Sequence, residues 1–435
     1  MDTPPKDPRV VIVGGGIGGL ALAQGLRQAG FGDVTVYERD ASPRGRMQGY
    51  RLRISPEGEQ AVKACLPARA RELLAATSNQ RGSEGLVAYD ERLNEMWSPD
   101  FTDPRADDPD KVDAVDRVTL RRVLLAGLGG AVRWGERFTH LERSGPEGRV
   151  VAHFAGGHAD TADVLIAADG ANSRVRGQLR PDDRHQDLGV RAILSRTPRA
   201  KADAAGLPEV LRDRFVNVTG SNGLRLALMP MVFRNPPREA AERIWPGLGF
   251  DPTEDYYMSV FSVHQDHLGL GDEAFFAMDG TALRDLVLER TADWHPDLRG
   301  VFAHAQPEET HPLALRATIP VEAWSAGNVI PLGDAAHTMP PTGGVGANTA
   351  LRDAAGLTRA LASAFHGGRD LAEAVAEYER DMVRYATEAI DTSLRIAKWS
   401  MKKIDVDGPP GPPAPSERSP ERPRGGAATR QGAAQ

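Results

Sequence analysis

The sequence predicts an α/β protein with a Rossmann-like domain, an inserted β-rich domain and a C-terminal helix. Three observations carry this prediction. A glycine-rich turn joins a short apolar strand to a helix near the start of the chain. Two later apolar runs end in Asp-Gly and Gly-Asp turns, as buried parallel strands do. Between those runs lie segments with the composition of strands in a separate sheet. The expected parts are 1–177 and 317–366 for the Rossmann-like domain and 178–316 for the β-rich insertion.

The N-terminal segment is expected to form a βαβ unit. Residues 9–13 are apolar and β-branched, residues 17–29 have helical periodicity, and residues 34–38 are again strand-like. The buried strands expected later in the chain are DVLIAA (163–168) and NVIPL (328–332). The strands expected in the insertion are 189–194, 224–229 and 256–263, and a hairpin at 85–97 is expected to join the same sheet.

The C-terminal part divides into a helix and a tail. Residues 371 to about 400 place apolar side chains at alternating spacings of four and three, which predicts a long amphipathic helix within an element at 367–404. The following segment, 405–435, is rich in proline and glycine and is expected to be disordered, because it cannot bury enough apolar area to offset its ordering entropy.

Composition limits the possible partners and compartments. The chain has 435 residues, 53 Lys plus Arg and 60 Asp plus Glu, so its formal charge of −7 favours neither nucleic acid nor an anionic membrane. A single cysteine, Cys65, excludes an intramolecular disulfide and a multi-cysteine zinc site. We expect a cytoplasmic protein, a monomer or homodimer, without a metal. His264 and His267 with Asp266 have the residue types of a metal site, but their spacing on one strand would not bring them together.

The strongest local motif is the turn Gly14-Gly15-Gly16-Ile17-Gly18-Gly19, which satisfies GxGxxG. Gly14 allows a tight turn, Gly16 leaves room for a pyrophosphate, and Gly19 lets the helix approach the strand. Glu38 follows Gly19 by 19 residues, at the end of the second strand, where an acid bonds ribose hydroxyls and disfavours a 2′-phosphate. The motif therefore predicts the adenosine of FAD or NAD and does not separate the two; a glycine-rich turn in another α/β protein is the structural alternative.

A second motif, GDAAHTMPPTGGVGAN (333–348), lies between a strand and an expected helix. Asp334 could bond a polyol there, and the helix start at Gly346, Ala347 and Asn348 could direct backbone amides at negative charge. On chemistry alone this segment could equally be an ordinary strand-to-helix turn. His337 within it is interpreted as a residue that fixes the turn rather than as an acid or base.

The three segments GGGIGG with Glu38, DVLIAADGANSRVR and GDAAHTMPPTGGVGAN together resemble the class A flavoprotein monooxygenases, the aromatic hydroxylase family, over residues 10–395. The resemblance implies noncovalent FAD and transient NADH or NADPH. It implies that Asp334 bonds the ribityl chain, that backbone from Gly343 to Asn348 approaches the flavin, and that Asp169 with Gly170 supports the pyrophosphate region. Further implied FAD contacts are Arg117, and less closely Arg39 and Arg51.

The sequence departs from the family pattern at two positions. Val345 stands where the family often has glutamine, and Ala350 where it often has glycine, so a contact made by that glutamine side chain is absent.

The family's chemistry implies hydroxylation of an aromatic or polycyclic small molecule by O2, through a flavin C4a-hydroperoxide. Substrate contacts are expected from the insertion, at Arg225, Met229 and Tyr257, with Leu226, Leu228 and Phe261 as further lining. The catalytic residue is left open, since the flavin carries the chemistry. Baeyer–Villiger insertion or epoxidation is the alternative on the same cofactor, whereas a halogenase is disfavoured because its WxWxIP motif is missing from the sequence. A flavin-binding scaffold without turnover is the alternative of another class.

Overall fold

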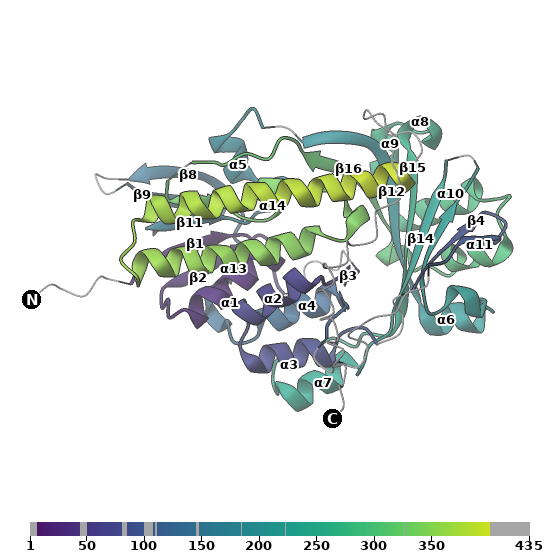
Figure 1. Cartoon of the computed structure of the whole chain (residues 1–435), viewed down its shortest axis with the longest axis horizontal. Helices are drawn as coiled ribbons and strands as arrows, with labels where there is room; N and C mark the ends of the chain where they lie inside the picture. Colours follow the sequence, from purple (N-terminus) through teal and green to yellow (C-terminus); the bar gives the residue numbers. More distant parts are fainter. Residues whose placement is uncertain are drawn as a thin grey trace, which may run out of the picture.

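The computed structural model describes residues 7–43, 50–80, 85–99, 108, 111–144, 148–183, 185–221, 223–325 and 327–400. An α/β domain and a seven-stranded sheet lie side by side, and the longest helix runs along both (Figure 1). The tail expected at 405–435 lies outside these described residues.

The first domain is built on a five-stranded parallel sheet of order β17-β11-β1-β2-β7. Its strands are β1 (Val10–Val13), β2 (Val34–Glu38), β7 (Val132–Trp134), β11 (Val164–Ala167) and β17 (Val329–Pro331). All four residues of β1 are buried because both faces of the sheet are covered. Val10 and Ile12 pack into the helical core, whereas Val11 and Val13 pack toward a second, three-stranded sheet.

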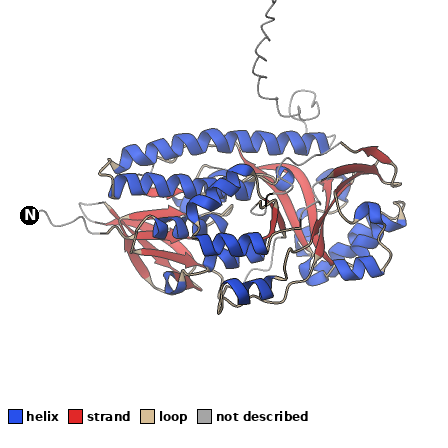
Figure 2. Cartoon of the chain, turned by 60° about the horizontal axis from the view of Figure 1, so that its bottom comes forward, coloured by secondary structure: helices blue, strands red, loops and turns tan. Residues whose placement is uncertain are grey.

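Helices cover one face of this sheet (Figure 2). They are α1 (Ile17–Gln28), α2 (Pro56–Cys65), α3 (Ala68–Ala76), α4 (Arg117–Leu125), α13 (Gly346–Phe365) and α14 (Leu371–Ser400). The other face packs on β8 (Phe138–Ser144), β9 (Arg149–Phe154) and β10 (Ala159–Ala162) and on α5 (Arg174–Leu179). A two-stranded ribbon of β3 (Arg51–Arg53) and β6 (Ala114–Asp116) leads into α4.

The second domain is a sheet of order β16-β12-β15-β14-β13-β4-β5. Its strands are β4 (Leu86–Asp90), β5 (Glu95–Trp97), β12 (His185–Pro198), β13 (Phe215–Thr219), β14 (Arg225–Met231), β15 (Tyr256–His264) and β16 (His311–Thr318). The segment expected as a hairpin at 85–97 therefore forms β4 and β5 of this sheet. Strand β12 is much longer than the expected 189–194, because it pairs along its length with both β15 and β16.

Helices pack on one face of the seven-stranded sheet and enclose its apolar core. The helices of this part of the chain are α6 (Arg199–Ala204), α7 (Pro237–Ile244), α8 (Gln265–Leu268), α9 (Asp272–Ala277), α10 (Gly280–Arg290) and α11 (Pro296–Ala303). Of these, α7 packs beside α3 of the first domain, away from that core. The short helix α12 (Asp334–His337) and four 3-10 turns, at Gly129–Ala131, Glu209–Leu211, Pro307–Glu309 and Pro341–Gly343, complete the described elements.

The long helix expected near the C-terminus is present as α14. Its buried side chains include Val375, Tyr378, Met382 and Tyr385, the same helical stripe that the spacing predicts. Tyr378 also donates a hydrogen bond to the Pro331 carbonyl, at 3.0 Å, so α14 is attached to the end of β17. The helix thus covers α13 and fixes the last strand of the parallel sheet.

Candidate active site

The candidate site residues lie at the carboxyl ends of four adjacent parallel strands. Glu38 ends β2, the glycine turn follows β1, Asp169 follows β11, and Asp334 follows β17. In the sheet order these strands are neighbours, so the line from Glu38 to Asp334 spans three strand spacings, roughly 14 Å. Open α/β sheets bind ligands along this edge.

The glycine turn is required by close packing and leaves one position open. Gly14 has φ +113°, and a Cβ there would lie 2.2 Å from the Ala168 carbonyl oxygen; a Cβ on Gly19 would lie 2.1 Å from the Gly14 carbonyl oxygen. A Cβ on Gly16 would have no described atom within 4 Å beyond its chain neighbours. In the described part of the chain no side chain caps the N-terminus of α1, and its first turn holds no acid. This helix end is therefore open to an anion.

Glu38 is held in place by backbone amides. Its Oε2 accepts a hydrogen bond from Gly15 N at 2.7 Å, and its Oε1 accepts one from Asp40 N at 2.9 Å. The carboxylate thus lies directly against the glycine turn. Each oxygen keeps a second lone pair that a ribose hydroxyl could use.

Arg121 is a site residue that the sequence analysis missed. It is 6% exposed, donates from Nε to the Gly15 carbonyl at 3.0 Å, and its Nη2 lies 3.1 Å from Asp40 and 3.6 Å from Glu38. Its guanidinium also lies over the Trp134 ring. The signal was available, because Arg121 follows the singled-out Arg117 by one helical turn and so lies on the same face of α4.

Arg117, Arg51 and Arg39 occupy different surroundings. Arg117 is half-buried at the start of α4. Its positive charge acts to lower the pKa of Asp334, so the two side chains are close enough to interact electrostatically. Arg51 pairs in register with Asp116, the residue that precedes Arg117. The structure thus brings Arg51 beside the start of α4, whereas Arg39 is exposed next to Glu38.

Asp334 is exposed although the three residues after it are buried. Desolvation by the surrounding protein raises the pKa of this carboxyl, against the opposing influence of His337, Arg117 and His185. Asp334 thus keeps solvent-accessible surface while the surrounding protein disfavours the charged form of its carboxyl.

A buried network fixes the turn that carries Asp334. His337 and Asp353 are both fully buried, and the His337 Nε2 lies 2.7 Å from the Asp353 Oδ2. The same Oδ2 accepts from Gly333 N at 2.8 Å, and Oδ1 accepts from the Tyr385 hydroxyl at 2.6 Å. Asp353 on α13 therefore ties together the turn and α14, and His337 acts within this network.

Asn348 connects the start of α13 to the β3–α2 loop. Its Oδ1 accepts from Ser55 N at 2.9 Å, and its Nδ2 donates to the Arg53 and Gly344 carbonyls, each at 2.9 Å. The Asn348 side chain is thus fully used in the protein. In the described residues no side chain caps the N-terminus of α13, so the backbone amides of its first turn are the available donors.

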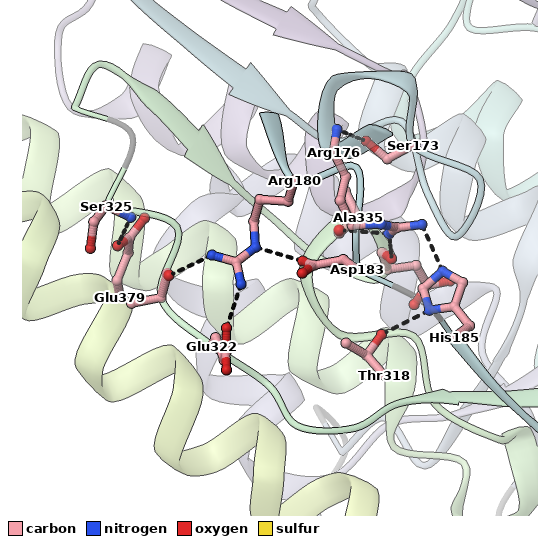
Figure 3. A network of polar contacts seen from close by, with 12 residues as sticks. Ser173, Arg176, Arg180, Asp183, His185, Thr318, Glu322, Ser325, Ala335 and Glu379 are labelled. Carbon is pink, nitrogen blue, oxygen red and sulfur yellow. Dashed lines mark hydrogen bonds and ion pairs between the residues drawn. The ribbon is translucent and has the colours of Figure 1, made fainter. Parts of the chain in front are cut away.

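Asp169 and Arg176 join the strand ends to α5. The Oδ2 of Asp169 accepts from Arg174 N at 2.7 Å and from Val175 N at 3.3 Å, and burial raises the pKa of this carboxyl. Arg176 donates to the Ala335 carbonyl at 2.8 Å and lies 2.7 Å from His185 Nε2 (Figure 3). Asp169 therefore positions α5, and α5 in turn supports the residue that follows Asp334.

Strand alternation decides which side chains of the insertion can face the nucleotide-binding domain. In the pairing of β14 with β15, Met229 lies opposite Met258 and Arg225 lies opposite Ser262. These four side chains are therefore on one face of the seven-stranded sheet. Met258 packs against the cluster that contains Tyr50, a residue of the first domain. Arg225 and Met229 are thus on the face toward the candidate cofactor site.

Tyr257 lies on the opposite face, and its expected role as a substrate contact is corrected. It is fully buried in the helix-covered core, and its hydroxyl donates to Asp203 at 3.0 Å. Leu226, Leu228 and Phe261 pack in the same core. The sequence pattern identified these strands, but not which of their two faces meets the first domain.

Known proteins support one family for this chain. Residues 288–393 match the family described as FAD binding domain, and residues 12–70 match the NAD(P)-binding Rossmann-like domain. A crystal structure of a candidate FAD-containing monooxygenase from Photorhabdus luminescens subsp. laumondii TTO1 is 31% identical, with TM-score 0.78, and the match covers 92% of this chain and 100% of that one. The chain belongs to the class A FAD-dependent flavoprotein monooxygenases.

Curated relatives of this chain support the same family. The dual O-methyltransferase/FAD-dependent monooxygenase CTB3 of Cercospora beticola is 30% identical over 86% of this chain, which spans 44% of that relative, somewhat under half its length. The phenazine 1,6-dicarboxylic acid hydroxylase PhzS of Lysobacter antibioticus is 29% identical, covering 85% of each chain. No helix among the described residues is long and apolar enough to cross a membrane.

The residues of this chain fit the cofactor of the family, FAD. The open space at Gly16 and the uncapped start of α1 suit a pyrophosphate, and Glu38 lies where a ribose would follow. At the other end of the same sheet edge, the accessible Asp334 and the free amides of α13 suit a polyol and a ring that carries negative charge.

Proposed function

We propose that this monooxygenase uses NADH or NADPH and O2 to hydroxylate an aromatic or polycyclic small molecule. The observation that carries the proposal is the single line of Glu38, the glycine turn and Asp334 along one sheet edge, with Arg225 and Met229 on the facing side of the second sheet. The similarity to the phenazine 1,6-dicarboxylic acid hydroxylase supports an aromatic substrate.

Bound FAD would supply the redox chemistry, by accepting hydride from the nicotinamide and activating O2. The protein holds it through named groups. The N-terminus of α1 with Gly16 binds the pyrophosphate, Glu38 binds the ribose, and Asp334 binds the ribityl hydroxyls, while the first amides of α13 stabilise negative charge on the ring. We propose that Arg117, Arg51, Arg39 and Asp169 act at the edges of this site, through charge and positioning.

We propose that the FAD is noncovalent. His337 is fully buried against Asp353, and Cys65 lies buried in the helical core, where burial raises the pKa of its thiol to about 12. Neither group is an accessible nucleophile.

The surroundings of Arg225 support a substrate that carries negative charge. Burial lowers the pKa of Arg225 to about 10, which still leaves the guanidinium charged at neutral pH. Among the described residues its only recorded hydrogen bond is to Thr219, and no acidic group there shifts its pKa. A charge removed from water without a counter-charge is costly, so an anionic substrate would offset that cost. We therefore propose an aromatic carboxylate or phenolate.

The experiment is a two-stage assay of the purified full chain. Flavin absorbance tests cofactor retention, and oxidation of NADH or NADPH is then followed with phenols supplied in pairs, with and without a carboxylate. We expect substrate-stimulated oxidation and a hydroxylated product by mass spectrometry. Arg225→Met should raise KM for the carboxylates more than for their neutral partners, whereas Arg225→Lys, which keeps the charge, should change this preference less.

The outcomes separate the alternatives. Protein that cannot be loaded with FAD would refute the proposal, and loaded protein that never oxidises NADH or NADPH would favour a flavin-binding scaffold. Oxygen inserted beside a ketone or across a double bond would indicate Baeyer–Villiger or epoxidising chemistry. Asp334→Ala should release FAD while the chain remains folded, and unchanged FAD retention would remove Asp334 from the cofactor site.

A further inference from the structure

Three side chains of types that can ligate a metal converge on the outer face of the three-stranded sheet, away from the cofactor site. They are His140 and Glu142 on β8 and His153 on β9. Strand pairing sets His140 directly opposite His153, and their rings are parallel, with centroids 4.3 Å apart. The opposite face of the same strands, which includes Leu141 and Ala152, is buried against the parallel sheet.

The distances suit a small cation. His140 Nε2 and His153 Nε2 each lie 3.6 Å from a different oxygen of Glu142, and the three ligand atoms lie within 4.8 Å of one another. Ligand atoms bound to one Zn²⁺ in tetrahedral geometry are about 3.4 Å apart. The two 3.6 Å distances end on different oxygens of Glu142, so the exposed Glu142 side chain and the His140 ring would have to shift by up to roughly 1.4 Å to bring ligand atoms that lie within 4.8 Å to this spacing.

Thr139 fixes the His140 tautomer that a metal requires. The Thr139 hydroxyl donates its single proton to the His153 carbonyl at 2.9 Å, and it lies 3.1 Å from His140 Nδ1. With that proton used, the hydroxyl can only accept from Nδ1, so Nδ1 carries the hydrogen and Nε2 presents its lone pair to the cluster. This is the outer contact that orients metal-ligating histidines.

Besides His140 Nε2, the ring nitrogen Nε2 of His153 is available as a metal ligand. Its Nε2 is buried and has no hydrogen-bond partner among the residues that the structure describes. The side chains of His140 and Glu142 are 51% and 63% exposed, so the cluster is open to solvent on one side, where water could complete the coordination. A buried ring nitrogen facing a carboxylate at 3.6 Å lacks the partner that a cation would supply.

We infer that His140, Glu142 and His153 bind a divalent transition-metal ion of the Zn²⁺ type. Two imidazoles and one carboxylate are ligands of zinc, and a solvent-facing fourth position would hold water. The ion would join β8 to β9 at the point where their pairing shifts register, between Phe138 and His140. The inference is independent of the proposed function, and it revises the expectation that the chain has no metal site.

The sequence did not reveal this cluster because His140 and His153 lie on different strands, 13 residues apart, outside any common ligand-spacing motif. Only the β8–β9 pairing makes them neighbours. A search by ligand spacing would find His264 and His267 instead, whose rings are 6.3 Å apart.

The test is Zn²⁺ binding to the untagged, FAD-loaded full chain after removal of metals by a chelator. Calorimetric titration should show one ion per chain, and Zn²⁺ should raise the thermal midpoint. His140→Ala and His153→Ala should each weaken binding by at least about tenfold, because even outer-shell partners of metal ligands are worth about 10- to 100-fold. The matched control is His304→Ala, which removes an exposed histidine outside the cluster.

Flavin absorbance and the metal-free thermal midpoint establish that each variant is folded. Equal Zn²⁺ affinity in the wild-type chain and in the double variant His140→Ala/His153→Ala would overturn the inference, as would no saturable binding by the wild type. An independent measurement on the wild type is an anomalous difference peak in Zn²⁺-soaked crystals. A peak between His140, Glu142 and His153 supports the site, and its absence there contradicts it.

Discussion

Replacing Asp353 tests whether the buried network holds the turn that carries Asp334. The carboxylate accepts three hydrogen bonds, from Gly333 N, from His337 and from the Tyr385 hydroxyl, at 2.6 to 2.8 Å. Asp353→Ala leaves all three donors without an acceptor in the interior. An unsatisfied buried donor costs about 1–3 kcal/mol, so the variant should lose at least about 3 kcal/mol of unfolding free energy. FAD should also dissociate faster, because Gly333 precedes Asp334.

The control is Tyr385→Phe, which removes one of these hydrogen bonds and keeps the ring. Its loss should be about 1–1.5 kcal/mol. Guanidinium unfolding followed by tryptophan fluorescence gives the stabilities, and flavin fluorescence gives FAD release. If Asp353→Ala does not fold, Asp353→Asn, which keeps one acceptor oxygen, should fall between the two. An Asp353→Ala variant no less stable than Tyr385→Phe would refute the reasoning.

Three further outcomes are expected. Gly16→Ala should change the unfolding free energy by no more than about 0.5 kcal/mol, because its Cβ enters open space, yet it should weaken FAD binding. Gly14→Ala, at φ +113° and against Ala168, should cost about 1–3 kcal/mol of unfolding free energy. Equal stability of the two variants would contradict this. Burial acts against the charged form of His337, but Asp353 raises the His337 pKa above its usual value. The unfolding free energy should therefore fall as the pH rises from about 6.5 through the pKa of His337 in the folded state. In urea unfolding measured across pH, His337→Asn should not show this fall. Arg121→Met should lose about 3–5 kcal/mol, because it removes the counter-charge of the buried Glu38 and half-buried Asp40 carboxylates. A loss below about 1 kcal/mol, as for an exposed pair, would count against the contact.

Local patterns in the sequence determined the elements that bind the dinucleotide. The glycine spacing, the acid after the second strand and the helical stripe of α14 depend on neighbours within one turn or one βαβ unit, and each is present in the structure. Their order in the chain also placed Asp334 at a strand end. These features could be predicted because short-range sterics and periodic burial fix them.

Tertiary structure decided which of these residues meet. Tyr257 and Arg225 have similar strand contexts, and only the packing of the sheet shows that Tyr257 faces the helices. Arg121 reaches Gly15 across 106 residues of chain, Asp353 reaches back 20 residues to Gly333, and His140 meets His153 through strand pairing. Such contacts depend on the relative placement of whole elements, which no local pattern of residues encodes.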